Sequence, residues 1–75
     1  EERPEGSYTV RLLDDKNLRL KKLGEETAEL VASLATGDRP RMVAEAADLV
    51  YHLLVALRAE EISAADLLQE LADRA

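Results

Sequence analysis

The sequence predicts an all-α protein, an antiparallel helical bundle that is completed by dimerisation. Leu and Ala dominate the composition while Trp and Phe are absent, which favours helices over strands. The few Gly and Pro residues fall where helices should begin or end, most clearly at residues 37–40 (Gly-Asp-Arg-Pro). One predicted helix is apolar around most of its circumference, and a chain of this length cannot easily bury such a helix alone.

Size and charge exclude several classes of protein. The 75 residues make one domain at most, spanning residues 1–75. With no Cys and one His, disulfides and thiolate zinc sites are excluded, so oligomerisation is the remaining way to stabilise so small a domain. The net charge of −6 argues against nucleic-acid binding, and no apolar run approaches membrane-spanning length. The absence of Cys and of a signal peptide is compatible with a cytoplasmic location.

The N-terminal part of the chain carries mixed signals. Residues 1–6 are predicted to form a helix end or a loop, and an N-terminal segment is expected to be missing because the chain opens without Met. Ser7 is a candidate cap for a short helix that extends to Leu13. The strand propensity of residues 8–10 (Tyr-Thr-Val) competes with this helix. A turn is predicted over residues 14–17.

Apolar residues at helical spacing predict a first long helix over about residues 18–36. Its apolar stripe consists of Leu20, Leu23, Thr27, Leu30, Val31 and Leu34. Gly24 lies inside this helix at a cost of about 1 kcal/mol relative to Ala, and such a glycine often marks the close approach of another backbone. Gly37 is a natural helix stop.

A second long helix is predicted over about residues 39–60, with Asp38 and Pro40 as start signals. Its apolar residues leave only a narrow polar strip, which consists of Arg41, Glu45, Asp48 and His52. A helix that is apolar nearly all round is buried nearly all round, and this favours a dimer or a larger bundle. A third helix is predicted to begin at Ser63, which forms a capping-box-like pair with Asp66.

Two pairs of carboxylates carry the candidate chemistry. Glu26 and Glu29 lie three residues apart on the first long helix, and Glu45 and Asp48 repeat this spacing on the second. Residues at this spacing meet on one helix face, with Cβ atoms roughly 5–6 Å apart. Two antiparallel helices could therefore present four carboxylates to one or two hard cations such as Mg²⁺. Such a site favours hydrolysis of a phosphate ester or anhydride.

The acidic residues of the first long helix also have a structural interpretation. Glu25, Glu26 and Glu29 are compatible with a solvated helix face. Lys21 and Lys22 lie one turn upstream, where they could pair with these glutamates. The two lysines could equally hold phosphate oxygens as point charges, or simply be solvated.

The polar strip of the second helix is harder to explain as an ordinary surface. A buried carboxylate without a partner costs several kcal/mol, so Glu45 and Asp48 must be paired or bound to a metal. The alternative is a salt bridge to Arg41 or to a neighbouring helix. His52 lies one turn beyond Asp48 on the same strip. It is a candidate substrate hydrogen-bond donor or a group behind the metal ligands, or else an interior or interface histidine whose hydrogen bonds are satisfied. Tyr51 points away from the strip and is expected to pack.

The acidic segments resemble a known signature. Residues 25–29 (Glu-Glu-Thr-Ala-Glu) and then 45–48 (Glu-Ala-Ala-Asp) resemble the all-α nucleotide pyrophosphatases of the MazG-like superfamily. Three longer segments narrow the resemblance to the phosphoribosyl-ATP pyrophosphatase family of histidine biosynthesis. They are residues 4–9 (Pro-Glu-Gly-Ser-Tyr-Thr), 21–26 (Lys-Lys-Leu-Gly-Glu-Glu) and 46–54 (Ala-Ala-Asp-Leu-Val-Tyr-His-Leu-Leu). The resemblance covers nearly the whole chain. Family members usually carry another helix before the Pro-Glu-Gly segment.

This resemblance implies the hydrolysis of phosphoribosyl-ATP to phosphoribosyl-AMP and diphosphate with Mg²⁺, or with Mn²⁺ in its place. By motif position, the expected metal ligands are Glu26, Glu29, Glu45 and Asp48. Glu25 is expected to orient or deprotonate the attacking water or to help a second ion, Lys21 and Lys22 to steady the polyphosphate, and His52 to contact the substrate. The resemblance also implies a homodimer, or a higher oligomer, in which helices of both chains form one bundle.

Two other functions stay open from the sequence. One is a house-cleaning pyrophosphatase that acts on nucleoside triphosphates or dUTP. Residues 6–9 (Gly-Ser-Tyr-Thr) argue against it because this segment belongs to the histidine-pathway branch. The other is a non-enzymatic helical dimerisation module, in which Glu45 and Asp48 are merely ion-paired.

Overall fold

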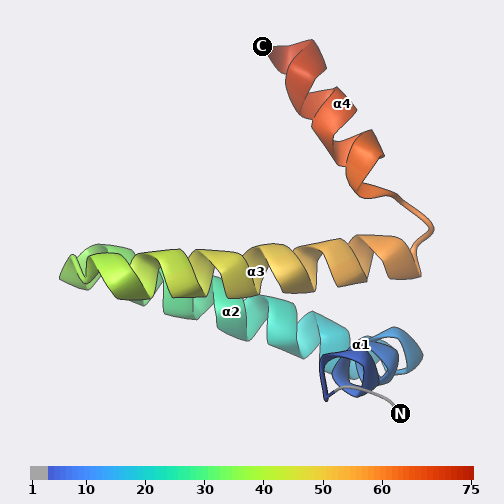
Figure 1. Cartoon of the computed structure of the whole chain (residues 1–75), viewed down its shortest axis with the longest axis horizontal. Helices are drawn as coiled ribbons and strands as arrows, with labels where there is room; N and C mark the ends of the chain where they lie inside the picture. The colour runs from blue at the N-terminus through green and yellow to red at the C-terminus, as the bar shows by residue number, and fades with distance from the viewer. Residues whose placement is uncertain (1–3) are drawn as a thin grey trace.

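The structure is a computed structural model that describes residues 4–75 (Figure 1). It contains α1 (Pro4–Asp14), α2 (Lys16–Thr36), α3 (Arg39–Ala59) and α4 (Ala64–Arg74). No strand occurs within residues 4–75, and this confirms the predicted all-α class. None of the described helices is long and apolar enough to cross a membrane.

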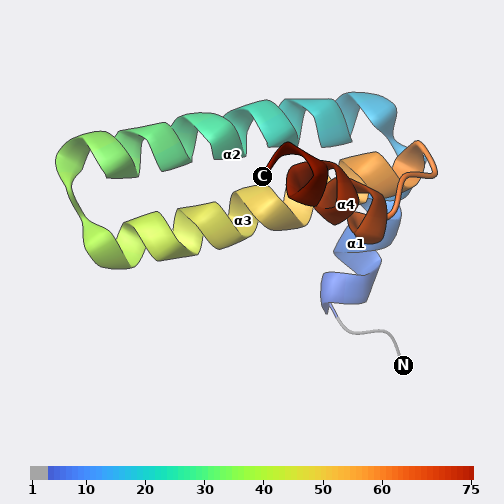
Figure 2. The ribbon, with the colours of Figure 1, turned by 90° about the horizontal axis from the view of Figure 1, so that it is seen from above.

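Helices α2 and α3 lie side by side and antiparallel, and they form the longest contact in the molecule (Figure 2). Gly37 ends α2 with a φ of 77°, and its N–H donates to the Ser33 carbonyl at 3.1 Å. The Asp38 carboxylate then accepts from the Arg41 N–H at 3.2 Å and caps α3. The predicted break is confirmed, and both long helices begin and end within two residues of their predicted bounds.

Helix α1 differs from its prediction. It begins at Pro4 instead of at Ser7, because proline fits the first turn of a helix and needs no N–H partner there. Ser7 therefore lies inside the helix, and residues 1–3 of the predicted loop lie outside the described residues. The predicted turn over residues 14–17 is reduced to Asp15, whose carboxylate accepts from the Leu18 N–H at 3.0 Å and caps α2.

Arg19 joins three helices at one end of the molecule. Its Nη1 donates to the carbonyls of Leu12 and Leu13 at 3.3 and 3.2 Å. These carbonyls lie in the last turn of α1, where no partner within the helix is available. The Nη2 of Arg19 lies 4.0 Å from Oε2 of Glu60, directly after α3. This guanidinium therefore holds α1 across the start of α2, with Leu12 fully buried in that corner.

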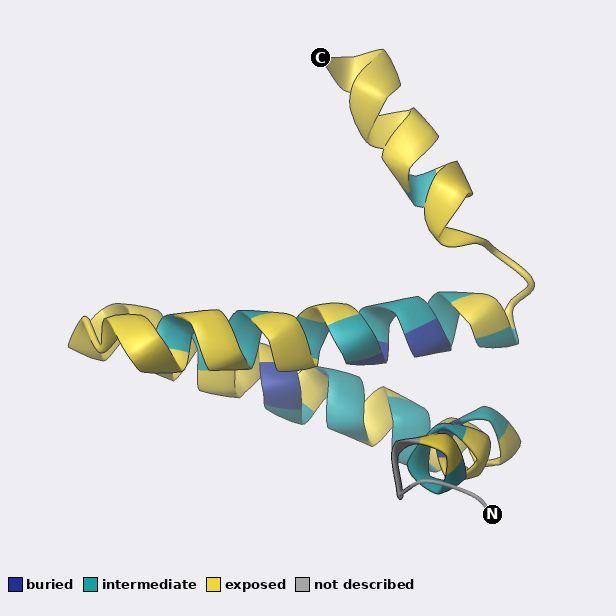
Figure 3. Ribbon diagram, in the orientation of Figure 1, coloured by how far each residue is buried: buried dark blue, intermediate teal, exposed yellow. Residues whose placement is uncertain are grey.

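Helix α4 stands away from the other three helices (Figures 1 and 3). The predicted capping box is confirmed, because the Ser63 hydroxyl accepts from the Asp66 N–H and the Asp66 carboxylate accepts from the Ser63 N–H. Along α4 every residue is exposed except Leu67, which is half-buried. An open hollow of about 390 Å³ lies between the end of α3 and the start of α4, and it is lined by Leu54, Arg58, Ile62, Ser63 and Ala64.

The apolar stripe of α2 is only partly covered, and Leu23 and Leu30 are its half-buried members. Leu20, Val31 and Leu34 are more than half exposed, while Glu26 and Ser33 are buried. In the described part of the chain, no atom lies within 4 Å of a Cβ built on Gly24, so the close backbone approach expected there is not formed within one chain. The single chain thus buries Glu26 and Ser33 of α2 and leaves much of its apolar stripe exposed.

The left-handed conformation of Gly37 generates a prediction about stability. Gly37→Ala should lower the free energy of unfolding by about 1–2 kcal/mol, because a Cβ disfavours positive φ. Gly37→Asn should cost less, since asparagine tolerates this conformation. Urea denaturation at one protein concentration measures both. Equal stability of the two variants and the parent would contradict the cap geometry.

Candidate metal centre

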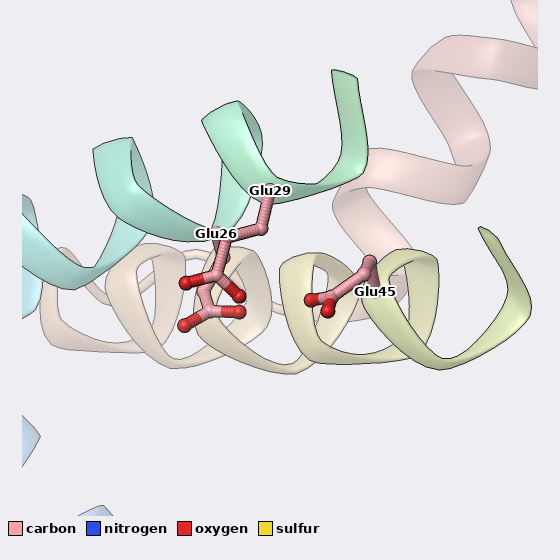
Figure 4. Close-up of side chains that lie close together, drawn as sticks. All are labelled: Glu26, Glu29 and Glu45. Atoms are coloured by element: carbon pink, nitrogen blue, oxygen red, sulfur yellow. The ribbon is translucent and has the colours of Figure 1, made fainter. Parts of the chain in front are cut away.

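Three carboxylates converge where α2 and α3 face each other. Glu26 and Glu29 extend from α2 toward α3, and Glu45 extends from α3 to meet them (Figure 4). One oxygen from each residue lies within 4.8 Å of the other two. The spacing of three on α2 places its two carboxylates on one face, and the antiparallel packing of α3 adds the third. Oxygen ligands of this kind suit Mg²⁺ or another hard divalent cation.

Two oxygens of this cluster lack a hydrogen-bond partner. Glu26 is buried and Glu45 is half-buried, whereas Glu29 is exposed. Oε1 of Glu26 and Oε1 of Glu45 are both buried and accept no hydrogen bond from the described residues. Burying an ionised oxygen without a partner is costly, so a cation, or a donor beyond the described residues, would stabilise both oxygens. The residues present therefore fit a divalent metal.

The second oxygen of each buried carboxylate faces a basic side chain. Lys22 Nζ lies 3.5 Å from Oε2 of Glu26, and Arg41 Nη2 lies 3.4 Å from Oε2 of Glu45. The salt bridge to Arg41 that offered an alternative explanation of Glu45 is thus present. It engages one oxygen only and leaves Oε1 without a partner.

The crowding of negative charge changes the ionisation of Glu29. A hydrogen bond with the Glu45 carboxyl is the largest cause that raises the pKa of Glu29, and the charges of Glu26 and Glu45 add to it. Such a bond needs a proton on one of the two carboxyls, so it is absent when both are ionised. The ionised carboxylates then repel one another, and a bound cation would relieve this repulsion.

Glu25 lies beside the cluster and is held by two lysines. Lys22 Nζ lies 3.3 Å from its Oε1, and Lys21 Nζ lies 3.9 Å from its Oε2. The hydrogen bond to Glu25 is also the main cause that raises the pKa of Lys22. Lys21 is largely exposed, whereas the Lys22 side chain is 29% exposed and reaches both Glu25 and Glu26.

Asp48 and His52 lie on the same strip of α3 but in different surroundings. Asp48 is exposed, and its carboxylate is not part of the three-residue cluster. His52 is buried, with Nδ1 2.7 Å from the Asp48 carbonyl oxygen and Nε2 2.7 Å from the Tyr8 hydroxyl. Both ring nitrogens are thus engaged within the chain. A metal contact at Asp48 and a substrate contact at His52 stay predictions.

Tyr8 is a residue near the site that reasoning from the sequence did not single out. Its ring stacks on Tyr51 with centroids 6.2 Å apart and meets the edge of His52 at 5.6 Å. The Tyr51 hydroxyl in turn forms a hydrogen bond with that of Thr9, so Tyr51 packs as expected. The only signal for Tyr8 was its place in the Gly-Ser-Tyr-Thr segment, since a contact across 44 residues leaves no local pattern.

Comparison with known proteins agrees with the resemblance. The profile of a family described as phosphoribosyl-ATP pyrophosphohydrolase matches residues 1–75. The phosphoribosyl-ATP pyrophosphatase of Pelotomaculum thermopropionicum is 44% identical over 75 residues, which cover 99% of this chain and 76% of that protein. The enzyme of the same name from Methanococcoides burtonii is 42% identical over 73 residues, with 93% and 74% covered.

A longer relative contains a similar segment. The histidine biosynthesis bifunctional protein HisIE of Thermotoga maritima is 41% identical over 75 residues, which cover 99% of this chain and 38% of that protein. No solved structure matches the chain. Since a family profile spans the whole chain and several relatives are more than 40% identical over nearly all of it, this protein belongs to the phosphoribosyl-ATP pyrophosphohydrolase family.

Proposed function

We propose that this chain hydrolyses phosphoribosyl-ATP to phosphoribosyl-AMP and diphosphate, a step of histidine biosynthesis. Family membership supports the reaction. The observation that carries the site is the convergence of Glu26, Glu29 and Glu45 around two buried oxygens that lack partners. A polyphosphate would be repelled by these carboxylates, so the reaction needs a cation between the two.

Mg²⁺ is the proposed cation, with Mn²⁺ as a substitute. Glu26, Glu29 and Glu45 would hold it, and Asp48, three residues after Glu45, is the proposed fourth ligand. Bound there, the ion would neutralise charge on the phosphates and lower the pKa of a coordinated water.

The basic residues beside the cluster have a role in this proposal. Lys21 and Lys22 would bind phosphate oxygens as point charges. They now engage both oxygens of Glu25, so phosphate binding would draw them away from that carboxylate. Glu25 would then be available to orient the attacking water and accept its proton. A direct substrate contact of His52 would require Tyr8 to give up its hydrogen bond.

We also propose that the chain works as a homodimer of MazG-like architecture. Among the described residues, the buried apolar side chains are Leu12 and Val55. The large apolar residues left exposed are Val10, Leu20, Val31, Leu34, Val43, Val50, Ile62, Leu68 and Leu71. Exposed apolar surface of this extent marks an interaction site, and a second copy would bury it in a shared bundle.

The carboxylate cluster is tested by removing one ligand at a time. Glu26→Gln and Glu45→Gln should each lower kcat/KM for Mg²⁺-dependent diphosphate release by at least about 100-fold, since even groups behind metal ligands contribute 10–100-fold. Each variant should also lose the rise in melting temperature that Mg²⁺ causes in the parent, because an ion bound only to the folded state stabilises it. Diphosphate release and thermal melting measure the two effects.

Glu70→Gln is the matched control for these variants. Glu70 is an exposed carboxylate that pairs with Arg74 on α4, so its loss should leave activity and the Mg²⁺ effect unchanged. Full activity of Glu45→Gln would contradict the proposed centre. A preference of the parent for simple nucleoside triphosphates or dUTP would favour a house-cleaning enzyme, and no release from any substrate would favour a dimerisation module.

The dimer is tested on the open apolar face of α2. Val31 is 59% exposed in the single chain, where Val31→Glu should change the free energy of unfolding by no more than about 0.5 kcal/mol. In a dimer the same change buries a charge in the interface and should produce a monomer of lower stability. Sedimentation at micromolar concentration and urea denaturation measure the two effects.

Ala32→Glu is the control, because Ala32 is also exposed but lies outside the apolar stripe of α2. It should sediment like the parent. A parent chain that sediments as a stable folded monomer would contradict the proposed dimer.

A further inference from the structure

A cluster of polar and aromatic side chains joins α1 to α3. It consists of Tyr8 and Thr9 from α1 and of Tyr51 and His52 from α3. Tyr8 stacks on Tyr51 and meets the edge of His52, and its hydroxyl lies 2.7 Å from Nε2 of that histidine. These contacts use the Tyr8 ring for packing and leave its hydroxyl for a directed interaction.

The position of the proton on the His52 ring follows from the group that its Nδ1 contacts. His52 Nδ1 lies 2.7 Å from the Asp48 carbonyl oxygen, which can only accept a hydrogen bond. Nδ1 of His52 therefore carries a proton. In the neutral ring Nε2 is then an acceptor, and the Tyr8 hydroxyl must donate to it. A directed series of hydrogen bonds thus runs from Tyr8 through His52 to the backbone of Asp48.

This series of hydrogen bonds connects α1 with the part of α3 that carries Asp48, a proposed metal ligand. At one end is the turn of α3 that carries Asp48, three residues beyond Glu45. At the other end is Tyr8 of α1, a helix that contacts both α2 and α3. Burial is the main cause that raises the pKa of Tyr8, and Glu26 raises it further while Lys22 lowers it. The charges of Glu26 and Lys22 on α2 thus act on Tyr8.

We propose that Tyr8 is a positioning residue for the metal centre, whose hydroxyl fixes the Asp48 turn of α3 through His52 and holds α1 against α3. This proposal rests on the proposed function, since it takes the carboxylate cluster as the site of the metal. Tyr8 itself is assigned no contact with the metal or with the reacting atoms. Groups that orient metal ligands typically contribute about 10–100-fold to metal affinity.

Tyr8→Phe tests the hydroxyl alone, because phenylalanine keeps the stacking on Tyr51 and the edge contact with His52. Its dissociation constant for Mg²⁺, measured by calorimetry without substrate, should rise about 10-fold or more. The Mg²⁺ concentration for half-maximal activity should rise by the same factor, with KM for phosphoribosyl-ATP at saturating Mg²⁺ nearly unchanged. A purely structural role would lower the melting temperature without changing Mg²⁺ affinity.

Thr9→Val is the matched control. It removes a hydroxyl from the same cluster that reaches Tyr51 instead of His52, so Mg²⁺ affinity and activation should match those of the parent. Nitrogen-15 NMR of the parent at about pH 8.5, well above the usual histidine pKa of about 6.5, should show His52 protonated on Nδ1 with Nε2 as an acceptor. The Nε2 resonance should shift in Tyr8→Phe and stay unchanged in Thr9→Val.

The outcomes separate this proposal from the proposed function. If the parent releases diphosphate but Tyr8→Phe matches its Mg²⁺ affinity, or Thr9→Val weakens that affinity equally, the positioning role is overturned and the function stands. An Nε2-protonated His52 in the parent also overturns it. If the parent binds Mg²⁺ without releasing diphosphate, the proposed function is overturned, while the Mg²⁺ titrations of the two variants still decide the role of Tyr8.

Discussion

The repulsion among Glu26, Glu29 and Glu45 is the constraint that shapes the contact between α2 and α3. Two antiparallel helices of this length would ordinarily meet along their apolar faces, but here a buried carboxylate and a second half-buried one lie between them. Lys22 and Arg41 each neutralise one oxygen of these carboxylates, and two other oxygens keep no partner. The proposed cation would neutralise these two oxygens and so would couple the stability of the hairpin to metal binding.

Placing the acidic residues between the helices has a second consequence, because it leaves large apolar side chains on the outer surface. Val31 and Leu34 on α2 and Val43 on α3 would be a liability on a monomer. In the proposed dimer the same residues become the shared core. The orientation of α2 about its own axis therefore accounts for both the acidic cluster and the exposed apolar surface. The small buried core of the single chain is consistent with this division, since Leu12 and Val55 alone would hold so short a domain weakly.

Helix α1 is attached through polar contacts at its two ends. Arg19 binds the carbonyls of its last turn, and Tyr8 binds His52 near its first turns. Directed bonds of this kind set the orientation of a helix more narrowly than apolar packing does, because each depends on angle as well as distance. Helix α1 supplies none of the carboxylates in the cluster. Its fixed orientation would instead support the residues that hold the proposed metal.

The sequence by itself determined the all-α class, the break at Gly37 and Asp38, the capping box at Ser63 and the shared face of Glu26 and Glu29 on α2, because all of these depend on residues within four positions of one another. It also supplied the family, through motifs that span most of the chain. Only the tertiary structure decided that the buried carboxylate is Glu26 while Asp48 is exposed, which reverses the weight that helix patterns assigned to them. It alone brought Tyr8 to His52. Periodicity shows which residues share a face, but which face meets another helix depends on contacts between distant segments and on the partner that covers the rest.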